Sequence, residues 1–314
     1  MTEMIRVAGL TKSFGDLIAV DHLSLSVQSG EILGFLGPNG AGKSTTMRMI
    51  TGFLDPTAGE ITVCGNDVLR DPIAARSRMG YLPEGAPLYG DITPAALMSF
   101  VAGARGLSGA EKRRKIDDAV GKLAIADVMY RPIETLSKGY KRRVALAQAI
   151  MHDPDVLILD EPTDGLDPNQ KRQVRNLIRD MGRDKAIVIS THILEEVDSV
   201  CTRAIIIAQG RIVFDGTPGE LEATSERHNA VCIRLPAERL TVARQAVESL
   251  PNVERVDVED ALQQISVMRI VPRDRQSIVQ DVSAALRQRE VPVEGLFVEQ
   301  GHLDEVFHRL TVGN

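Results

Sequence analysis

The sequence lacks the features that would mark a membrane-spanning or secreted chain. Its longest apolar runs, such as AIVI and AIIIA, fall far short of the roughly 20 residues that a helix needs to cross a bilayer. Its first residues, MTEMIRVAGL, lack the basic-then-apolar order of a signal peptide. The three cysteines, Cys64, Cys201 and Cys232, are scattered without metal-ligand spacing. We therefore expect a cytoplasmic chain with reduced cysteines that cannot cross a membrane alone.

An excess of positive charge is also absent. The net charge is −6 and the isoelectric point is near 5.6, whereas binding nucleic acid regardless of sequence depends on many clustered cations. The short basic runs EKRRK and KGYKRR are more typical of solvated helix faces. On these grounds we expect no nucleic-acid partner.

The order of strand-like and helical segments predicts two domains in this chain of 314 residues. Residues 1–224 have the character of an α/β domain, with a helical insert at about 91–152 that is rich in Ala, Leu, Met, Lys and Arg. The polar stretch EATSERHN then looks like a linker. Residues 225–314 follow the order β-α-β-β-α-β, which fits a small α+β ferredoxin-like domain.

A parallel crossover is predicted in the second half of the large domain. Strands VLILD (156–160) and AIVIS (186–190) flank a helix with Asp167 as its cap, Pro168 in its first position and Gly182 near its end. Strand, helix, strand at this spacing indicates a parallel sheet. The next stretch, AIIIAQGRIVFDG, predicts a hairpin about Gln209 and Gly210.

A phosphate loop is predicted at residues 37–45, GPNGAGKST, between a strand and a helix. Its glycines let backbone N–H groups point at phosphate oxygens, with the helix dipole behind them. Lys43 would contact the β- and γ-phosphates, and the Ser44 hydroxyl would bind Mg²⁺. A chance match has a probability on the order of one in a hundred. The predicted nucleotide-binding residues here are Gly37, Pro38, Asn39, Gly40, Ala41, Gly42, Lys43, Ser44 and Thr45.

Polar residues stand where two apolar strands end. Asp160 falls in the crevice where doubly wound sheets bind ligands, and it is a candidate for holding Mg²⁺. Glu161 is placed to orient or deprotonate the water that attacks a γ-phosphate. His192 follows the second strand as a candidate γ-phosphate contact. Taken alone, LDEP is about twice as often a strand that runs into a turn as a catalytic motif, and a histidine in this position is about three times as often a structural turn residue as a phosphate contact. The order of all the elements together favours the functional interpretation.

The segment LSKGYKRRV (136–144), here called the signature segment, begins a predicted helix with Ser137 as its cap. Four cations and no acid follow Ser137, although the positive end of a helix dipole favours acids. The segment therefore predicts a nearby anion or, failing that, a solvated face.

Together these motifs resemble those of the ATP-binding subunits of ABC transporters over about residues 4–224. The phosphate loop is similar to the Walker A loop, VLILDE to the Walker B strand with Glu161 as the catalytic glutamate, DGLD to the D-loop with Asp167, and STH to the switch with His192. KSFG resembles the loop whose aromatic ring, here Phe14, stacks on adenine. The resemblance implies a P-loop NTPase fold with a parallel-sheet core, an antiparallel amino-terminal β region and a helical insert.

The signature segment stands where the family has its signature. The resemblance implies that Ser137 and Gly139 meet the γ-phosphate of an ATP held by a second ATP-binding subunit. It also implies ATP and Mg²⁺ as cofactors, ATP hydrolysis, a homodimer in the ATP state, and separate transmembrane permease subunits that hold the chain at the inner face of the cell membrane. TDGLDPNQ and LDEVFHRLT look like the export-type branch paired with type-2 permeases, such as gliding-motility-associated and drug-resistance subunits.

The sequence departs from the family pattern at three residues. Lys138 replaces a glycine and Tyr140 replaces the usual glutamine of the signature, which brings side-chain bulk to the expected interface. Glu84, in YLPEG, stands where most relatives have a glutamine that reaches Mg²⁺ and the attacking water. A carboxylate can still coordinate Mg²⁺, so Glu84 remains a catalytic and metal-binding candidate.

Two other classes of function fit the motifs less well. A soluble ABC ATPase that remodels nucleic acid or ribosomes would carry tandem ATPase halves or long coiled-coil insertions, whereas this chain has one phosphate loop and no sustained heptads. A P-loop kinase or GTPase leaves the signature segment unexplained, and no Asn-Lys-x-Asp stretch for guanine occurs. For residues 225–314 a stabilising or dimerising role is the simpler interpretation, with a regulatory ligand sensor as the alternative.

Overall fold

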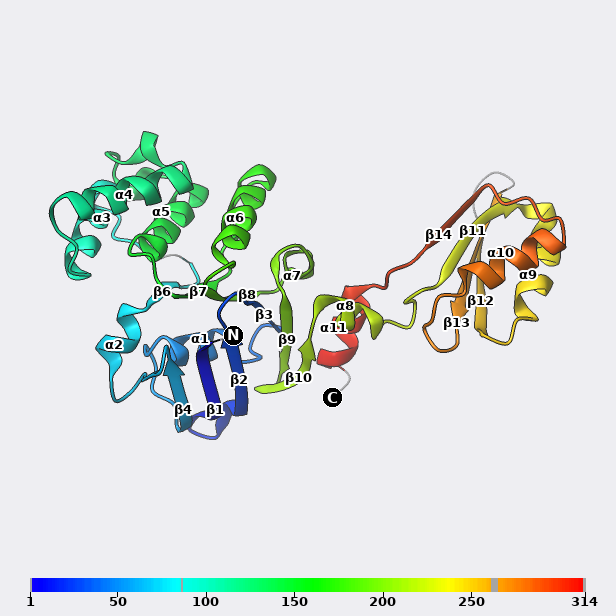
Figure 1. Ribbon diagram of the computed structural model, residues 1–314, viewed down its shortest axis with the longest axis horizontal. Helices are drawn as coiled ribbons and strands as arrows, with labels where there is room; N and C mark the ends of the chain where they lie inside the picture. Colours follow the sequence, from blue (N-terminus) through cyan, green and yellow to red (C-terminus); the bar gives the residue numbers. More distant parts are fainter. Residues whose placement is uncertain (1, 86, 261–264, 313–314) are drawn as a thin grey trace. The chain divides into compact units, whose positions relative to one another are not determined.

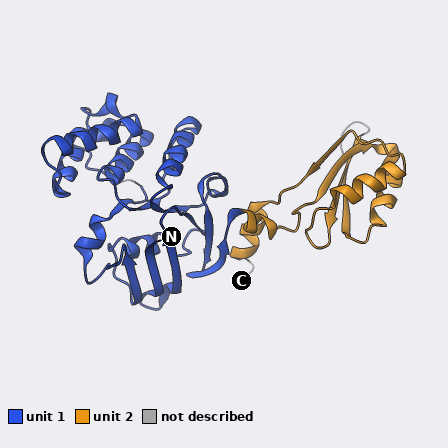
Figure 2. Ribbon diagram, viewed as in Figure 1, with its two compact units in different colours: residues 1–218 blue, residues 219–314 orange. Residues whose placement is uncertain are grey.

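The computed structural model describes residues 2–85, 87–260 and 265–312. The chain folds into two compact units, Met1–Pro218 and Gly219–Asn314 (Figure 2). The stretch expected as a linker, EATSERHN, starts inside helix α8 (Pro218–Ala223), and Ser225 is buried. This segment is therefore packed structure, because the N–H of His302 and the N–H of Arg227 both donate to the Ser225 hydroxyl.

A six-stranded sheet forms the centre of the first unit (Figure 1). Neighbouring strands are parallel except at the β9–β10 hairpin, where Gln209 and Gly210 turn with positive φ as the sequence predicts. The central strands are apolar without alternation because both of their faces are buried. In sheet order the strands are β10 (Arg211–Gly216), β9 (Arg203–Ala208), β3 (Ile32–Leu36), β8 (Ala186–Thr191), β7 (Val156–Asp160) and β6 (Met79–Leu82).

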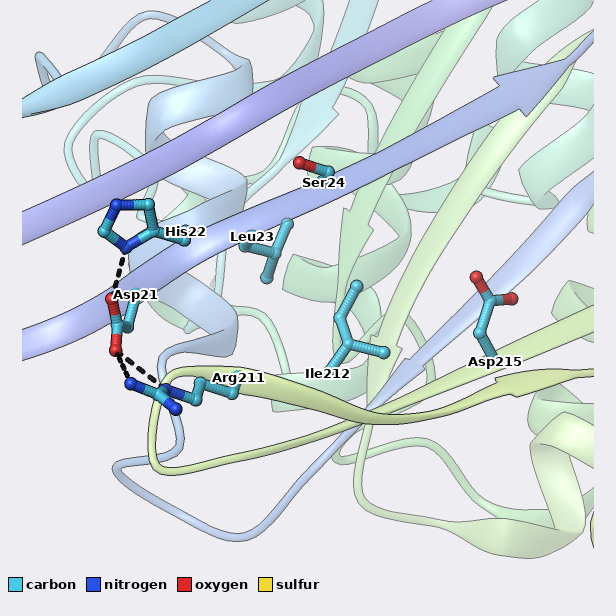
Figure 3. A pocket seen from close by; sticks show the side chains of 7 residues that line it. All are labelled: Asp21, His22, Leu23, Ser24, Arg211, Ile212 and Asp215. Carbon is cyan, nitrogen blue, oxygen red and sulfur yellow. Dashed lines mark hydrogen bonds and ion pairs between the residues drawn. The ribbon is translucent and has the colours of Figure 1, made fainter.

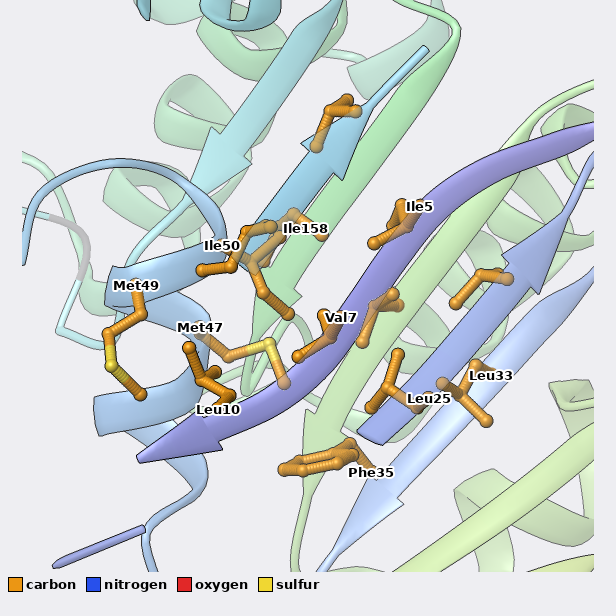
Figure 4. Packing of buried hydrophobic residues seen from close by; sticks show 14 of the residues in the cluster. Ile5, Val7, Leu10, Leu25, Leu33, Phe35, Met47, Met49, Ile50 and Ile158 are labelled. Carbon is orange, nitrogen blue, oxygen red and sulfur yellow. The ribbon is translucent and has the colours of Figure 1, made fainter. Parts of the chain in front are cut away.

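An antiparallel sheet, formed by amino-terminal residues, lies in the same unit. The sequence of the first 90 residues predicts short strands and turns, but the first two strands of this sheet have 12 residues each. Alternate residues face the core over most of their length. Figure 4 shows this core, where Val7 of β1 and Phe35 of β3 pack with Met47 of α1 (Lys43–Ile50). In sheet order the strands are β2 (Leu17–Gln28), β1 (Glu3–Phe14), β4 (Ala58–Val63) and β5 (Asn66–Asp67).

The helical insert is present where the sequence predicts it. Its helices are α3 (Pro94–Ala104), α4 (Gly109–Leu123) and α5 (Lys138–Ile150), with two short 3-10 turns, Ala126–Val128 and Ile133–Thr135, before α5. The remaining helices of the unit are α2 (Pro72–Ser77), α6 (Pro168–Met181) and α7 (Leu194–Val200). Helix α6 confirms the predicted boundaries: Asp167 Oδ1 accepts from the N–H of Gln170, Pro168 comes first, and Gly182 ends the helix.

The second unit confirms the predicted ferredoxin-like order. Its sheet runs β12-β13-β11-β14 with antiparallel neighbours, and α9 and α10 bury an apolar face against it. The elements are β11 (Val231–Pro236), the 3-10 turn Ala237–Arg239, α9 (Leu240–Glu248), β12 (Val253–Asp260), β13 (Ile265–Pro272), α10 (Val279–Gln288) and β14 (Gly295–Val298). The stretch QQISVMRI predicts that β13 begins at residue 263, but residues 263 and 264 lie outside the described residues. A final helix, α11 (Leu303–Val312), was not predicted. Over the described ranges, no helix has both the length and the apolar character needed to cross a bilayer.

Candidate nucleotide site

The phosphate loop joins β3 to α1 and packs closely against two neighbouring strands. A Cβ on Gly37 would lie 2.5 Å from the Ile207 carbonyl oxygen of β9, and one on Gly42 would lie 2.5 Å from the Ala19 carbonyl oxygen of β2. Gly42 also has a φ of 105°, which side chains strongly disfavour. These two glycines are therefore required by close backbone approach, and the core strands fix the shape of the loop.

Exposure changes along the phosphate loop. Its tip, Pro38, Asn39 and Gly40, is exposed, whereas Ala41 is buried and Thr45 is half-buried. The N–H of Ala41 donates to Pro38 O over 3.2 Å, and Ala41 O accepts from the N–H of Gly210 over 3.1 Å. The turn of the β9–β10 hairpin is thus hydrogen-bonded to the phosphate loop.

Lys43 is the buried cation of the loop, with only 7% of its surface exposed. Its Nζ donates to Gly37 O over 2.6 Å and to Pro38 O over 3.1 Å. Burial lowers the pKa of Lys43, and the negative charges of Glu161, Asp160 and Glu84 raise it. The structure therefore gathers the three predicted acids around the predicted phosphate-binding cation.

Asp160 ends β7 and is 2% exposed. Burial raises the pKa of its carboxyl, whereas the hydroxyls of Ser190 and Ser44 lower it, and the nearby charge of Glu84 raises it further. Carboxylate and hydroxyl oxygens are the hard donors that Mg²⁺ prefers. Ser44 and Asp160, with Glu84 close by, fit a magnesium ion.

Glu161 and His192 lie side by side after β7 and β8, with His192 Nδ1 at 2.8 Å from Glu161 Oε1. Glu161 takes a φ of 52°, and its N–H donates to Ser190 O of β8 over 2.8 Å. Burial raises the pKa of the Glu161 carboxyl and His192 lowers it, while Glu196 and Asp160 raise it. A carboxylate of raised pKa beside a histidine is suited to accept a proton.

The signature segment begins α5, where the N–H of Tyr140 donates to Ser137 Oγ over 3.3 Å, so the predicted cap is confirmed. Ser137 is exposed and Gly139 is buried. A Cβ on Gly139 would lie 2.8 Å from Gln170 Oε1 of α6. The segment is thus anchored against its own chain at Gly139, while Ser137 is exposed.

The basic run of the signature segment divides into two buried and two less buried cations. Arg142 is buried and donates to Pro83 O over 3.2 Å, to Asp160 O over 2.7 Å and to Glu161 O. Burial lowers the pKa of Arg142, and the charge of Asp164 raises it. The sequence patterns did not single out this residue, although the apolar run VALA (144–147), which begins two residues later, indicates a buried helix face.

Arg143 and Tyr140 are bound within the helical insert. The Arg143 guanidinium lies 4.2 Å from the centre of the Tyr140 ring and donates to Leu123 O and Ala124 O. The Tyr140 hydroxyl donates to Asp127 Oδ2 over 2.7 Å. The bulk of Tyr140 is therefore turned toward Asp127 within its own chain.

Lys138 pairs with the segment that follows Glu161. Its Nζ lies 2.9 Å from Asp164 Oδ2, and this contact lowers the pKa of Asp164. A Cβ on Gly165 would lie 2.6 Å from Lys138 Cδ, so the aliphatic part of the Lys138 side chain packs against Gly165 where a side chain would collide with it. Asp164 supplies the acid that the first turn of α5 lacks.

Phe14 is the last residue of β1. Its side chain is 49% exposed, and Lys12 Nζ is 5.2 Å from its ring centre. Asp167 is exposed and caps α6, which is a structural task in its own right.

A separate hollow of about 570 Å³ lies between β2 and β10, and none of the predicted site residues lines it (Figure 3). Asp21 pairs there with His22 Nδ1 at 2.6 Å and with Arg211 Nη2 at 2.6 Å. His22 and Arg211 lower the pKa of Asp21. This hollow is held by its own ion pairs and does not belong to the phosphate site.

Comparison with known proteins decides the family. The chain is 32% identical over 314 residues to the Nod factor export ATP-binding protein I of Ralstonia nicotianae, across 99% of this chain and 94% of that protein. It belongs to the ABC transporter ATP-binding family. The family pattern "ABC transporter" matches residues 20–164. The daunorubicin resistance ATP-binding protein DrrA3 of Streptomyces coeruleorubidus is 33% identical, across 98% of this chain and 95% of that protein.

Other comparisons agree in part of the chain. YbhF of Escherichia coli, a probable multidrug ABC transporter ATP-binding protein, is 38% identical, but the match covers 71% of this ABC chain and 38% of YbhF. A solved ATP-binding subunit of an ABC transporter aligns with a TM-score of 0.66 and 29% identity, across 70% of this chain and 92% of that one. These findings confirm the resemblance and the predicted fold class.

Proposed function

We propose that this ABC protein hydrolyses ATP to power an exporter whose permease is a separate transmembrane protein. The observation that carries the proposal is the meeting of Lys43, Asp160 and the Glu161–His192 pair at one edge of the parallel sheet. A phosphate-binding cation, a metal-binding carboxylate and a general base are the parts that phosphoryl transfer to water needs.

ATP binding would use the phosphate loop. Its N–H groups and Lys43 would hold the β- and γ-phosphates, and Phe14 would stack on the adenine. Ser44 and Asp160, with Glu84, would hold Mg²⁺, which neutralises charge on the phosphate oxygens when bound.

Hydrolysis would place a water between Glu161 and the γ-phosphorus. Glu161 takes one proton of this water as the new P–O bond forms and the bond to the ADP oxygen breaks, which releases ADP and phosphate. His192, hydrogen-bonded to Glu161, would orient that carboxylate and contact the γ-phosphate. The raised pKa of Glu161 brings the base closer to neutral pH than an ordinary glutamate.

A second ATP-binding subunit, most simply another copy, would complete each site. Ser137 is exposed at a helix start whose first turn carries no acid, as expected of a surface that receives an anion. Ser137 and Gly139 of one copy would contact the γ-phosphate held by the other, with Asp167 at the same interface.

A groove of about 620 Å³ between the core and the helical insert is our proposed contact for the permease. Phe53 is 71% exposed and Tyr89 is 68% exposed in its lining, beside the cations Arg48 and Arg105. Exposed aromatic and arginine side chains are enriched where proteins bind each other. Bound there, the chain would lie peripherally at the inner face of the membrane. Export is supported by the names of the Nod factor and daunorubicin relatives.

The test is phosphate release by the purified protein with Mg-ATP, compared with the Glu161→Gln variant. We expect the variant to bind ATP normally and to lose about a hundred- to ten-thousandfold in kcat, because a positioned general base contributes that much. Wild-type turnover in this variant would remove Glu161 from the proposed role. The export step can be tested in a drug-efflux assay, by expressing the chain with and without a membrane protein that a neighbouring gene encodes.

A further inference from the structure

A buried carboxylate joins the loops that carry Glu161 and His192. Glu196 of α7 is only 3% exposed. Its Oε2 accepts from Thr191 Oγ1 over 2.8 Å, and its Oε1 accepts from Thr163 Oγ1. Thr163 lies two residues after Glu161, and Thr191 directly precedes His192. One side chain therefore binds both loops.

Both threonines are themselves fixed. They are buried, and Thr191 Oγ1 also accepts from the N–H of Ile193 over 3.1 Å. This hydrogen bond joins the residues directly before and after His192. On the other loop, the N–H of Asp164 donates to Glu161 O over 3.1 Å. The hydrogen bonds run without a break from the Glu161 loop through Glu196 to the His192 loop.

Charge compensation of Glu196 is weak for a buried acid. The cation beside it, Arg175, has Nη2 at 3.8 Å from Glu196 Oε1, while its Nη1 lies 2.9 Å from Oε1 of the exposed Glu195. Burying a carboxylate is costly unless hydrogen bonds compensate, and an apolar side chain of similar size would fill the same space at lower cost. The advantage of an acid at this position is therefore its hydrogen bonds to the two threonine hydroxyls.

We infer that Glu196 is a positioning residue that holds Glu161 and His192 at their 2.8 Å separation by binding the threonine beside each. The inference rests on the proposed roles of Glu161 and His192. Lys43, whose Nζ binds the carbonyls of the phosphate loop, does not depend on this link. Loss of Glu196 should consequently slow the chemical step and leave ATP affinity intact.

The central experiment measures kcat and KM for Mg-ATP in Glu196→Met, which keeps the length and removes both acceptor oxygens. We expect kcat to fall about ten- to a hundredfold, since misplacement of a catalytic group by about 1 Å costs that much, with KM within twofold of wild type. Glu196→Gln retains one acceptor oxygen and should recover part of the loss. Glu195→Met, the adjacent exposed partner of Arg175, is the matched control and should retain wild-type kcat.

A second readout separates positioning from simple destabilisation. Thr163→Val should lower kcat as Glu196→Met does, Thr163→Ser should restore it, and the double variant Thr163→Val/Glu196→Met should lose little more than either alone.

Three outcomes would overturn the inference. Wild-type kcat in Glu196→Met shows that no positioning is needed. Additive losses in the double variant show that the two residues act separately, and equal losses in kcat, ATP affinity and melting temperature show a merely structural role. If Glu161→Gln still loses turnover in the same assays, the proposed ATPase mechanism survives and only the role of Glu196 fails.

Discussion

The phosphate loop and the signature segment are both proposed to contact an anion, but they bury different side chains. The phosphate loop buries its cation, Lys43, in its own chain among Asp160, Glu161 and Glu84. The signature segment buries Arg142 and leaves Ser137 exposed at the helix start. We propose the first as a site within one chain and the second as an anchored half-site that a partner subunit completes. Predictions that separate them follow from this difference.

The largest effect is expected at the phosphate loop. Lys43→Ala should weaken ATP binding by about a hundred- to ten-thousandfold, because it removes charge-assisted contacts with two phosphates worth about 1.5–3 kcal/mol each. Isothermal titration with ATP and Mg²⁺ measures this. Lys122→Ala, on the exposed face of α4, is the control and should bind as wild type does. A normal Kd in Lys43→Ala would mean that the loop is not the nucleotide site.

The anchoring of the signature segment is expected to contribute mainly to stability. Arg142→Met removes the donors to the carbonyls of Asp160 and Glu161, and should lower the free energy of unfolding by about 2–3 kcal/mol. Urea denaturation gives this number, with the exposed Arg172→Met as the comparison. If both variants unfold alike, the buried contacts of Arg142 do not anchor α5.

The exposed half of the signature segment should act only between subunits. Ser137→Ala in a Glu161→Gln background should leave ATP binding by monomers unchanged and weaken ATP-driven dimerisation about tenfold, since one hydrogen bond to a charged phosphate is lost. Sedimentation with and without ATP reports both species. Thr93→Ala, which removes the side-chain cap of α3, controls for the loss of a helix cap. Unchanged dimerisation would count against a site shared by two subunits.

The smallest effect is expected at Lys138, because its pair with Asp164 is exposed. Lys138→Met and Asp164→Asn should each change kcat by no more than about fivefold, the range of surface ion pairs, and the double variant should resemble either single one. If Lys138 instead contacts the partner's phosphate, Lys138→Met alone will weaken dimerisation and Asp164→Asn will not.

The sequence by itself determined the order of elements and the residues of the phosphate site. Strands of unbroken apolar residues, the cap at Asp167 and the hairpin about Gln209 are local patterns, so they could be identified one window at a time. The same holds for the phosphate loop, because the glycines and the lysine proposed to bind a phosphate all fall within residues 37–45. The β-α-β-β-α-β order of the second unit was visible for the same reason, although helix α11 was not.

Only the tertiary structure decided what the remaining polar residues do. Its neighbours in sequence would allow Arg142 to be a solvated cation. In the structure it is buried and donates to the carbonyls of Asp160 and Glu161, at the end of β7. Glu195 and Glu196 are the same residue type, yet Glu195 is exposed and Glu196 binds Thr163 and Thr191 in the two loops that follow β7 and β8. These contacts depend on how β7 and β8 place distant loops side by side. That proximity is set by the parallel sheet, and no local pattern encodes it.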